Sequence, residues 1–186
     1  IVLHTVKAVG ETIGSQELQK QLIKNCLQTK NWAYNLMAGK LYAALYRKEL
    51  YDDMLPTVKQ QHENMFKLGY MVQLNYTDEE YKEIESFIDH DRDYKLAHFQ
   101  IHQLRKKYSL NDKIKKKEFE TPQFIFMRMA MALAEDEQID KLLHVKNWYD
   151  HFSYGRINAP TPNYVNLGTK HNGYASCCLY TTDDTA

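Results

Sequence analysis

Two adjacent cysteines near the end of the chain, Cys177 and Cys178, are the residues with the most obvious chemical potential. They lie in the run from Tyr174 to Tyr180, which is rich in residue types that favour β-strands. On a strand, neighbouring side chains point to opposite faces, so one thiol can face a site while the other packs inside the protein. A disulfide between neighbours would need a strained ring. Residue types alone leave open whether Cys177 is reactive or both thiols are buried and inert.

Two hydroxyl side chains accompany this pair. Thr161 lies between Pro160 and Pro162, and Ser176 immediately precedes Cys177. The two prolines predict a rigid turn, because each ring fixes its own backbone φ angle. A rigid turn, a polar loop and a thiol-bearing strand together predict a site at the end of a sheet. The chain before residue 150 is expected to form its helical support.

Two histidine-containing patterns invite comparison with metal sites. In the run 89–93, Asp-His-Asp-Arg-Asp, ligand types alternate at i and i+2, which do not share a helix face. We therefore predict ion pairs and helix caps there. His98 and His102 are spaced i, i+4, but no Glu-x-x-His partner accompanies them. We expect these two rings to pack or hydrogen bond at the surface, and no metal site is predicted.

A cluster of lysines is the remaining charged feature. Such a run is usually a solvated loop, and no aromatic residues are interleaved to stack on bases. The chain as a whole carries 24 basic and 24 acidic side chains, so its net charge favours neither nucleic acid nor an anionic membrane as a partner. The cluster comprises Lys106, Lys107, Lys113, Lys115, Lys116 and Lys117.

Length and composition predict one globular domain, or one domain with a small appendage, in 186 residues. No apolar run approaches the length of a membrane span, and no signal peptide is recognisable. Three cysteines that form no disulfide framework fit a reducing, cytoplasmic compartment. The chain begins Ile-Val-Leu, which suggests a processed, truncated or excised piece.

Helical periodicity dominates the first 155 residues. Ser15 can cap a first helix, and small residues between Ala38 and Ala44 predict close packing of a second. Thr77 and Glu80 form a capping box, and Pro122 is placed to begin a buried apolar helix. A helix is predicted to begin at Ser15, and others are predicted over 31–51, within 57–75 together with a connection, from Thr77 to the charged run at 89–93, over 96–108, from Pro122 to Leu133 and over 139–152, with a hairpin near 108–120.

Several motifs together resemble a known family. They are Phe-Ile-Asp-His-Asp-Arg-Asp at 87–93, Phe-Glu-Thr-Pro-Gln-Phe at 119–124, Leu-His-Val-Lys-Asn-Trp-Tyr-Asp at 143–150, Pro-Thr-Pro at 160–162 and Ser-Cys at 176–177. Their order and spacing are similar to the large, or alpha, subunit of class I ribonucleotide reductase. The bacterial and T4-like phage forms are the most similar. The resemblance covers nearly the whole chain and is strongest from about residue 77 to 184.

The resemblance implies roles for individual residues near the active site. Thr161 matches a threonine at the phosphate and sugar end of the substrate, and Ser176 matches a serine in the same pocket. Cys177 matches the first cysteine of the redox pair, which supplies electrons when the ribose 2′-hydroxyl leaves. Cys178 stands where the family usually has an apolar residue. Lys107 matches a lysine near the active site.

Three further residues match effector positions in that family. Asp184 corresponds to an acidic residue of the specificity site, which binds a deoxynucleotide. Ser15 and Lys48 fall near ATP-contacting positions, although aligning both requires a gap between them. The glycine-rich, basic hairpin that opens a complete ATP-cone is absent from the sequence. ATP and deoxynucleotides are thus implied as effectors, with no cofactor bound directly by this chain.

The implied fold is mainly α, formally α+β. Residues 1–51 would be a partial ATP-cone, consisting of its later helices only. Residues 52–155 would be the helical N-terminal domain of the large subunit. Residues 156–186 would begin a ten-stranded α/β barrel. The family's radical cysteine, its second redox cysteine and its C-terminal thiol shuttle have no counterpart in this sequence.

The implied function is therefore part of ribonucleoside-diphosphate reductase, with the isolated chain inactive. Implied partners are the rest of the large subunit, a metal-containing small (beta) subunit that supplies the radical, thioredoxin or glutaredoxin, and nucleotide substrate and effectors. One alternative is a non-catalytic helical binding module that retains the family framework. Another is a redox protein that uses Cys177 and Cys178, which their opposite orientation on a strand disfavours.

Overall fold

The structure is a computed structural model that describes residues 1–8, 13–52, 54–112, 114–171 and 173–176. These residues form nine α-helices, two irregular helical turns and one small hairpin. The α-helices are α1 (Val2–Ala8), α2 (Ser15–Gln28), α3 (Trp32–Tyr51), α4 (Val58–Lys67), α5 (Asp78–Phe87), α6 (His98–Gln103), α7 (Pro122–Ala134), α8 (Lys141–Ser153) and α9 (Thr161–Asn166). The turns are the 3₁₀ segment η1 (His90–Lys95) and the π-helical segment η2 (Leu104–Tyr108). Strands β1 (Asn111–Asp112) and β2 (Lys117–Glu118) pair antiparallel.

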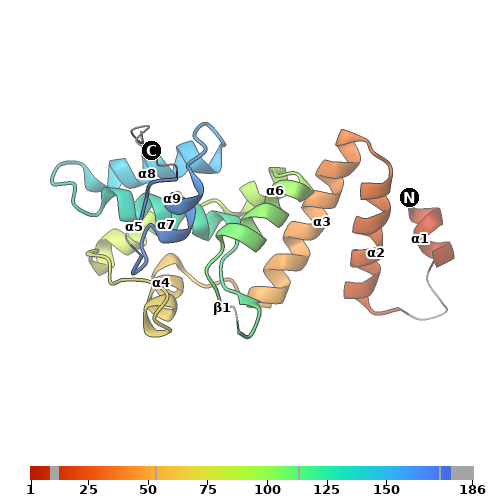
Figure 1. Cartoon of the computed structure of the whole chain (residues 1–186), viewed down its shortest axis with the longest axis horizontal. Coiled ribbons are helices and arrows are strands. Elements are labelled where there is room, and N and C mark those ends of the chain that lie inside the picture. The colour runs from red at the N-terminus through yellow and green to blue at the C-terminus, as the bar shows by residue number, and fades with distance from the viewer. Residues whose placement is uncertain (9–12, 53, 113, 172, 177–186) are drawn as a thin grey trace, which may run out of the picture.

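Helix α7 lies at the centre of the larger part of the molecule. Its sequence, Pro-Gln-Phe-Ile-Phe-Met-Arg-Met-Ala-Met-Ala-Leu-Ala, is apolar on nearly every side, as expected for a helix surrounded by protein. Pro122 occupies its first turn, where a missing N–H costs nothing. Helices α4 and α8 pack against it, and α5 packs on α4 and α8 (Figure 1). The buried side chains of Ile125, Met129 and Val145 belong to this core.

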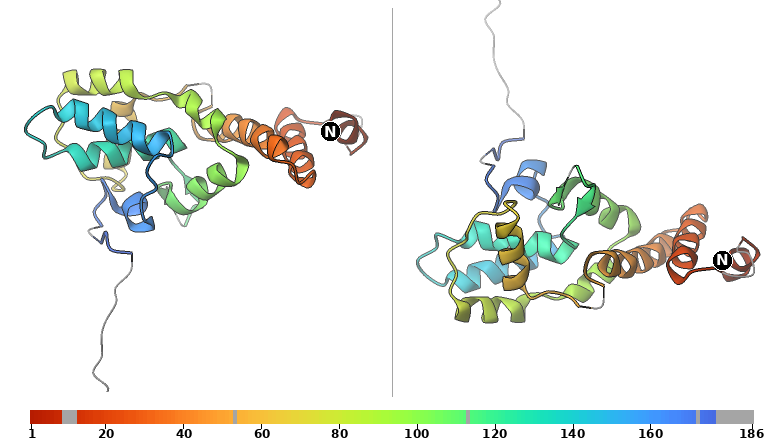
Figure 2. Two further views of the ribbon diagram at one scale, coloured as in Figure 1. Left: turned by 90° about the horizontal axis from the view of Figure 1, so that it is seen from above. Right: turned by 90° about the horizontal axis from the view of Figure 1, so that it is seen from below.

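Helix α3 connects the core to the N-terminal helices. It packs on η1 and α6 on one side and on α2 on the other, so the molecule is elongated (Figure 2). Gly39 allows the first of these contacts, because a Cβ atom there would lie 2.1 Å from the carbonyl oxygen of Leu96. The small residues predicted to permit close packing therefore do so. A second, smaller core between α2 and α3 contains Ile23, Cys26, Ala38 and Leu45.

Most predicted helices are confirmed within a few residues. The capping box at Thr77 and Glu80 is present, with both reciprocal hydrogen bonds. The periodic stretch 96–108 differs from prediction, because it is divided into a short α-helix and the π-helical turn η2. Among the residues described, no helix is long and apolar enough to cross a membrane.

The prediction for the closing segment is only partly met. Pro160 and Thr161 do not form an isolated rigid turn; they begin the short helix α9, which Pro162 joins in its first turn. Residues 174–176 are exposed and have no strand geometry. The predicted strand continues into residues 177–180, which lie outside the described residues. The boundary proposed at residue 156, between a helical domain and a barrel, stays a prediction.

The ion pairs and the cap predicted for residues 89–93 are present, and so is the predicted packing of His98 with His102. Arg92 pairs with Asp150 at 2.7 Å and with Asp89 at 3.4 Å, and the Asp89 side chain accepts a hydrogen bond from the Asp91 backbone. His98 and His102 stack with a centroid distance of 6.0 Å, and Tyr42 packs against both. Among the described residues, no group of three or more metal-ligand side chains occurs.

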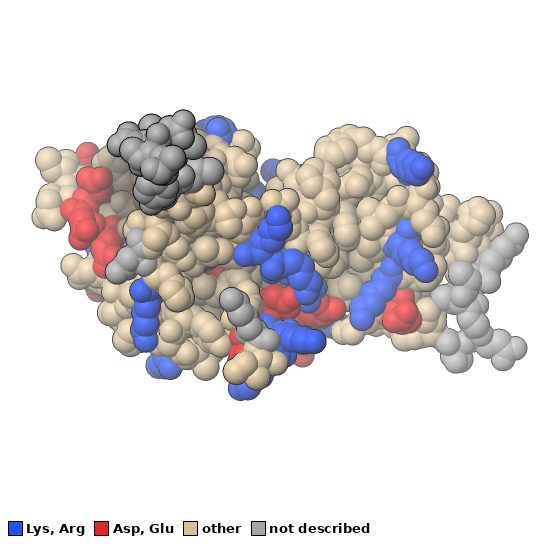
Figure 3. Space-filling model, in the orientation of Figure 1, with Lys and Arg blue, Asp and Glu red and all other residues tan. Residues whose placement is uncertain are grey.

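Basic and acidic side chains are intermixed on the face of the molecule shown in Figure 3. Lys106, from the lysine cluster, forms an ion pair with Glu118 of the hairpin at 2.5 Å. Arg105 pairs with the same carboxylate at 3.3 Å and with Glu49 of α3 at 2.9 Å. The cluster is thus partly neutralised by the protein itself, which agrees with its interpretation as a solvated surface.

Candidate functional site

Thr161, at the start of α9, contacts a side chain 53 positions earlier in the chain. Its Oγ1 lies 3.4 Å from the hydroxyl oxygen of Tyr108, the last residue of η2. The Tyr108 hydroxyl also accepts a hydrogen bond from Gln103 Nε2 at 3.2 Å. Thr161 is exposed and Tyr108 is half-buried, so a ligand can reach both hydroxyl groups. This pair is the centre of the candidate site.

Stacking fixes the orientation of the Tyr108 ring. It lies nearly parallel to the ring of Tyr164 in α9, with centroids 4.4 Å apart and an angle of 16° between the planes. Tyr164 is itself buried, and its hydroxyl donates to Asn158 Oδ1 at 3.1 Å. Because stacked rings lose rotational freedom together, the Tyr108 hydroxyl is held near Thr161 rather than sweeping through solvent.

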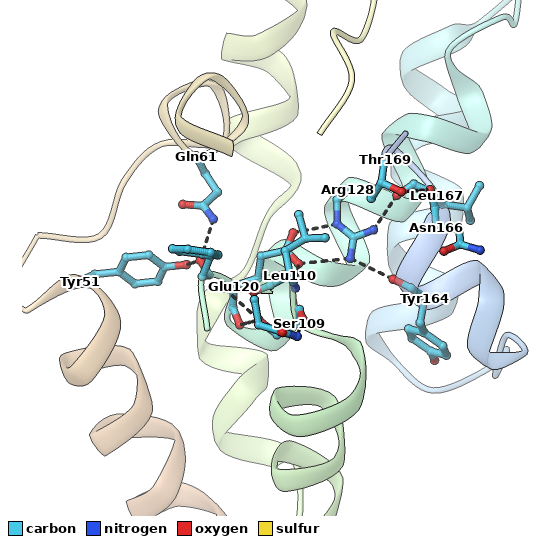
Figure 4. A network of polar contacts seen from close by, with 12 residues as sticks. Tyr51, Gln61, Ser109, Leu110, Glu120, Arg128, Tyr164, Asn166, Leu167 and Thr169 are labelled. Atoms are coloured by element: carbon cyan, nitrogen blue, oxygen red, sulfur yellow. Dashed lines mark hydrogen bonds and ion pairs between the residues drawn. The ribbon is translucent and has the colours of Figure 1, made fainter. Parts of the chain in front are cut away.

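A buried ion pair holds the backbone of α9, which carries Tyr164, in place (Figure 4). Arg128 of α7 donates from Nε to Glu120 Oε1 at 2.8 Å and from Nη2 to Glu120 Oε2 at 3.2 Å. The same guanidinium donates to the backbone carbonyls of Leu167 at 2.6 Å and Tyr164 at 2.9 Å. Both charged side chains are nearly inaccessible to solvent. One arginine therefore ties α9 to α7 and to the segment after the hairpin.

The segment between η2 and α7 is tied to the same carboxylate. Glu120 Oε2 accepts a hydrogen bond from the Leu110 backbone N–H at 2.9 Å, and the Glu120 carbonyl accepts one from the Tyr46 hydroxyl at 2.7 Å. The neighbouring carbonyl of Phe119 accepts from Tyr51 and from Gln61, at 2.9 and 2.8 Å. Figure 4 shows Tyr51, Gln61 and Leu110 gathered around Glu120. Both sides of the Tyr108–Thr161 contact are thus fixed to one polar network.

A cavity of about 630 Å³ opens beside the tyrosine pair. Its walls come from η1, α6 and η2 on one side and from the end of α8, the following loop and α9 on the other. Aromatic and amide side chains predominate, and the lining residues include Arg92 and Lys95 but no aspartate or glutamate. Arg92 is already paired with Asp150, whereas Lys95 is exposed. The cavity is thus suited to a ring system with an anionic or hydrogen-bonding group.

The electrostatic environment distinguishes Tyr108 from other tyrosines. Its pKa is lowered, chiefly by the hydrogen bond with Thr161, and further by Gln103 and the charge of Lys107, against a smaller opposing effect of burial. Burial raises the pKa of Tyr70, Tyr149 and Tyr164. A lowered pKa makes the Tyr108 hydroxyl a better hydrogen-bond donor toward an anion.

The other predicted site residues are less well connected. Lys107 is exposed on η2, next to Tyr108. Ser176 is exposed, and no hydrogen bond to Thr161 is recorded for it within the described part of the chain. Cys177 and Asp184 lie outside the described residues. Sequence reasoning proposed Thr161 as a site residue and did not propose Tyr108, whose only available signal was its position after Lys107.

Ser15 and Lys48, the predicted ATP-contacting residues, lie in the N-terminal helices. Ser15 begins α2, and Lys48 lies in the last turn of α3. The two helices are antiparallel neighbours (Figure 1), so both residues are near the same end of the pair. Both are exposed, and no direct hydrogen bond or ion pair joins them in the described structure. Their role as an effector site stays a prediction.

A second buried polar cluster lies on the other side of α7. Asp93 Oδ1 accepts a hydrogen bond from Gln123 Nε2 at 2.9 Å, and Gln123 Oε1 accepts from the hydroxyls of Tyr149 and Ser153, both at 2.7 Å. Burial raises the pKa of Asp93 to about 7, and the hydrogen bond from Gln123 opposes this shift only in part. Burial also lowers the pKa of neighbouring His90 to about 4, with a further contribution from Arg47. These groups form a structural cluster that does not reach the cavity except through Ser153.

Comparison with known proteins identifies relatives of the region that carries the Tyr108–Thr161 contact. Residues 94–172 match the family described as "Ribonucleotide reductase, all-alpha domain". The alpha subunit of ribonucleoside-diphosphate reductase from Enterobacteria phage T4 is 30% identical over 177 residues, covering 91% of this chain and 24% of the relative. The corresponding subunit 1 alpha of Escherichia coli K12 is 30% identical over 156 residues, covering 81% and 20%. The chain thus spans a fifth to a quarter of the length of these relatives.

Proposed function

This chain belongs to the ribonucleotide reductase large-subunit family, and we propose that it forms the N-terminal part of a subunit that reduces ribonucleoside diphosphates. The observation that carries the proposal is similarity over 91% of the chain to the T4 alpha subunit. The matched all-alpha domain contains Tyr108, which lines the cavity, and Thr161, whose hydroxyl oxygen lies 3.4 Å from that of Tyr108. The related subunits act on ribonucleoside diphosphates according to their names.

Within this proposal, the chain contributes one wall of the substrate pocket. Thr161 donates a hydrogen bond to the phosphate and sugar end of the nucleotide, and Ser176 binds in the same pocket. Lys107 adds a positive charge beside Tyr108 that favours an anionic substrate. The buried Glu120–Arg128 pair keeps α9, and with it Thr161, in a fixed position relative to η2. Binding and orientation are thus the tasks of the described residues.

Cys177 is proposed to supply electrons. In the overall reaction the ribose loses its 2′-hydroxyl as water, while two thiols lose two electrons and two protons and become a disulfide. Cys177 is one of these thiols, and the second belongs to the remainder of the subunit. Thioredoxin or glutaredoxin would then return the disulfide to thiols. A metal-containing small subunit would supply the radical that starts the reaction.

Two further groups of residues are proposed to bind regulatory nucleotides. Asp184 is proposed to contact a deoxynucleotide effector, and Ser15 and Lys48 are proposed to lie near ATP. Residues 1–51 would then be the later helices of an ATP-cone, followed by the helical domain at 52–155 and the barrel from 156. The position of Ser15 and Lys48 near the same end of the α2–α3 pair is compatible with a shared ligand.

A chimera tests the proposal. The corresponding N-terminal region of the T4 alpha subunit is replaced by this chain, and reduction of CDP is measured with a matching small subunit and reductant. We expect deoxy-CDP to form under multiple-turnover conditions, and the isolated chain to form none. Turnover by the isolated chain would contradict the proposal. A folded chimera without activity would favour a non-catalytic binding module.

A further inference from the structure

Tyr108 occupies a position that the proposed function does not use, although it contacts Thr161. It terminates η2, the π-helical turn Leu104–Tyr108. Single π-helical turns are rare and are often found at functional sites, because the extra residue redirects the side chains that follow. Here the redirected side chain points to α9, where its hydroxyl lies 3.4 Å from Thr161 Oγ1.

The separation of the two hydroxyl oxygens is suited to a shared acceptor. At 3.4 Å, one oxygen atom can lie within about 2.8 Å of both, which is the usual length of an O–H···O hydrogen bond. Each hydroxyl has a proton to donate. Gln103 already donates to the Tyr108 oxygen, which leaves the Tyr108 proton free to point outward toward Thr161 or a ligand.

The surroundings favour an anionic acceptor attached to a larger group. Lys107 lies beside Tyr108 in sequence and is exposed, and the adjoining cavity has no acidic side chain in its lining. The cavity volume of about 630 Å³ is within the range that holds small-molecule ligands. Its aromatic residues, among them Phe99, Phe126 and Tyr154, offer apolar surface to a ring.

We propose that Tyr108 is a substrate-binding residue, whose hydroxyl joins that of Thr161 in donating hydrogen bonds to one phosphate oxygen of a nucleoside diphosphate. Tyr164 positions it by stacking, and the Arg128 contact with the Tyr164 carbonyl holds that platform in place. The sugar and base extend from this clamp toward the cavity. This inference rests on the proposed function, because it assumes that Thr161 meets the phosphate end of a nucleotide.

The test compares phosphate-bearing and phosphate-free probes. Binding of CDP and of cytidine to the chain is measured by NMR titration for the native sequence, Tyr108→Phe, Thr161→Val and the double variant. Tyr108→Phe keeps the ring that stacks on Tyr164 and removes only the hydroxyl. Tyr34→Phe is the matched control, since Tyr34 is exposed on α3 and does not line this cavity.

We expect Tyr108→Phe to weaken CDP binding about tenfold, the typical effect of losing one hydrogen bond to a charged group, and to leave cytidine binding unchanged. Thr161→Val should have a similar effect, and the double variant should lose less than the product of the two, because the hydroxyls share one acceptor. Tyr34→Phe should bind CDP as the native chain does.

Two results would overturn the inference. The first is native-like CDP binding by Tyr108→Phe. An equal loss of CDP and cytidine binding would count against the inference in the same way, because it would indicate a merely structural role for Tyr108. The second is no CDP binding by the native chain at millimolar concentration. The proposed function is judged separately, by deoxy-CDP formation in the chimera. An active chimera with native-like CDP affinity in Tyr108→Phe would reject the tyrosine's role and retain the reductase assignment.

Discussion

The two buried carboxylates on either side of α7 are satisfied in different ways. Glu120 faces the guanidinium of Arg128, which balances its charge and fills both of its oxygens. Asp93 is equally buried, but its hydrogen-bond partner is the neutral amide of Gln123. An amide satisfies a hydrogen bond without compensating a charge, so burial shifts the protonation of Asp93 toward the neutral acid. The cluster around Glu120 positions the candidate site, and the cluster around Asp93 holds η1 against α7 and α8.

Removing the arginine gives the largest expected effect. In Arg128→Met the carboxylate of Glu120 stays buried without a counter-charge, and the carbonyls of Tyr164 and Leu167 lose their donor. We expect a loss of about 3–5 kcal/mol in the free energy of unfolding. Denaturant unfolding at pH 7 measures it.

A double variant controls for this change. Glu120→Gln combined with Arg128→Met removes the unpaired charge, so it should be more stable than Arg128→Met alone. A loss below about 1 kcal/mol for Arg128→Met would show that the pair does not hold α9 in place.

The second prediction concerns the pH dependence that Asp93 confers. Its pKa is about 7 in the folded protein, against an ordinary value of 3.8. The unfolded chain therefore releases the proton first, and stability falls as pH rises from about 4 to about 7, then levels off. The Asp93 contribution should be on the order of a few kcal/mol.

Asp93→Asn should remove this contribution, because an amide side chain does not titrate. The hydrogen bond is kept, since the asparagine carbonyl can still accept from Gln123. The variant should be more stable than the native chain at pH 8 and about equal to it near pH 4. Comparison at both pH values separates Asp93 from His90, whose lowered pKa is present in both proteins. Parallel pH profiles for the two proteins would contradict a buried, protonated Asp93.

The smallest effect is expected for Tyr149→Phe. This change removes one of two hydroxyls that donate to Gln123 Oε1, and Ser153 continues to donate to the same oxygen. The Asp89 backbone N–H also loses an acceptor. We expect a loss of about 1 kcal/mol in the free energy of unfolding. A loss as large as that of Arg128→Met would show that the neutral cluster is as critical as the ion pair.

The fold could be predicted from sequence where local signals set it. Thr77 with Glu80 and Pro122 mark helix starts through short-range geometry, and both helices form as predicted. The run 89–93 was predicted to make ion pairs and caps, and it does. Which of its three aspartates is buried could not be predicted, because Asp93 is buried with a hydrogen-bond partner, Gln123 of α7, that is 30 positions away in sequence.

The candidate site also combines a residue that local sequence signals indicate with one that depends on contacts between distant parts of the chain. Thr161 could be proposed as a site residue from its position between two prolines within a family pattern. Tyr108 could not, because its significance depends on a π-helical turn and on a contact across 53 residues. The strand at 174–180 was predicted from β-favouring residue types alone. Its described residues, 174–176, are not in a strand. Strand propensity depends on neighbours that pair with the segment, and residue types do not provide these.

The most direct test of the reductase assignment compares the two neighbouring cysteines in the chimera. Multiple-turnover CDP reduction is measured for Cys177→Ser and for Cys178→Ser. Each variant replaces one sulfur atom by oxygen, and the two positions are neighbours in the sequence. The account predicts that Cys177→Ser abolishes multiple turnover, whereas Cys178→Ser retains most of the activity. Unchanged steady-state activity in Cys177→Ser would contradict its role as a redox thiol.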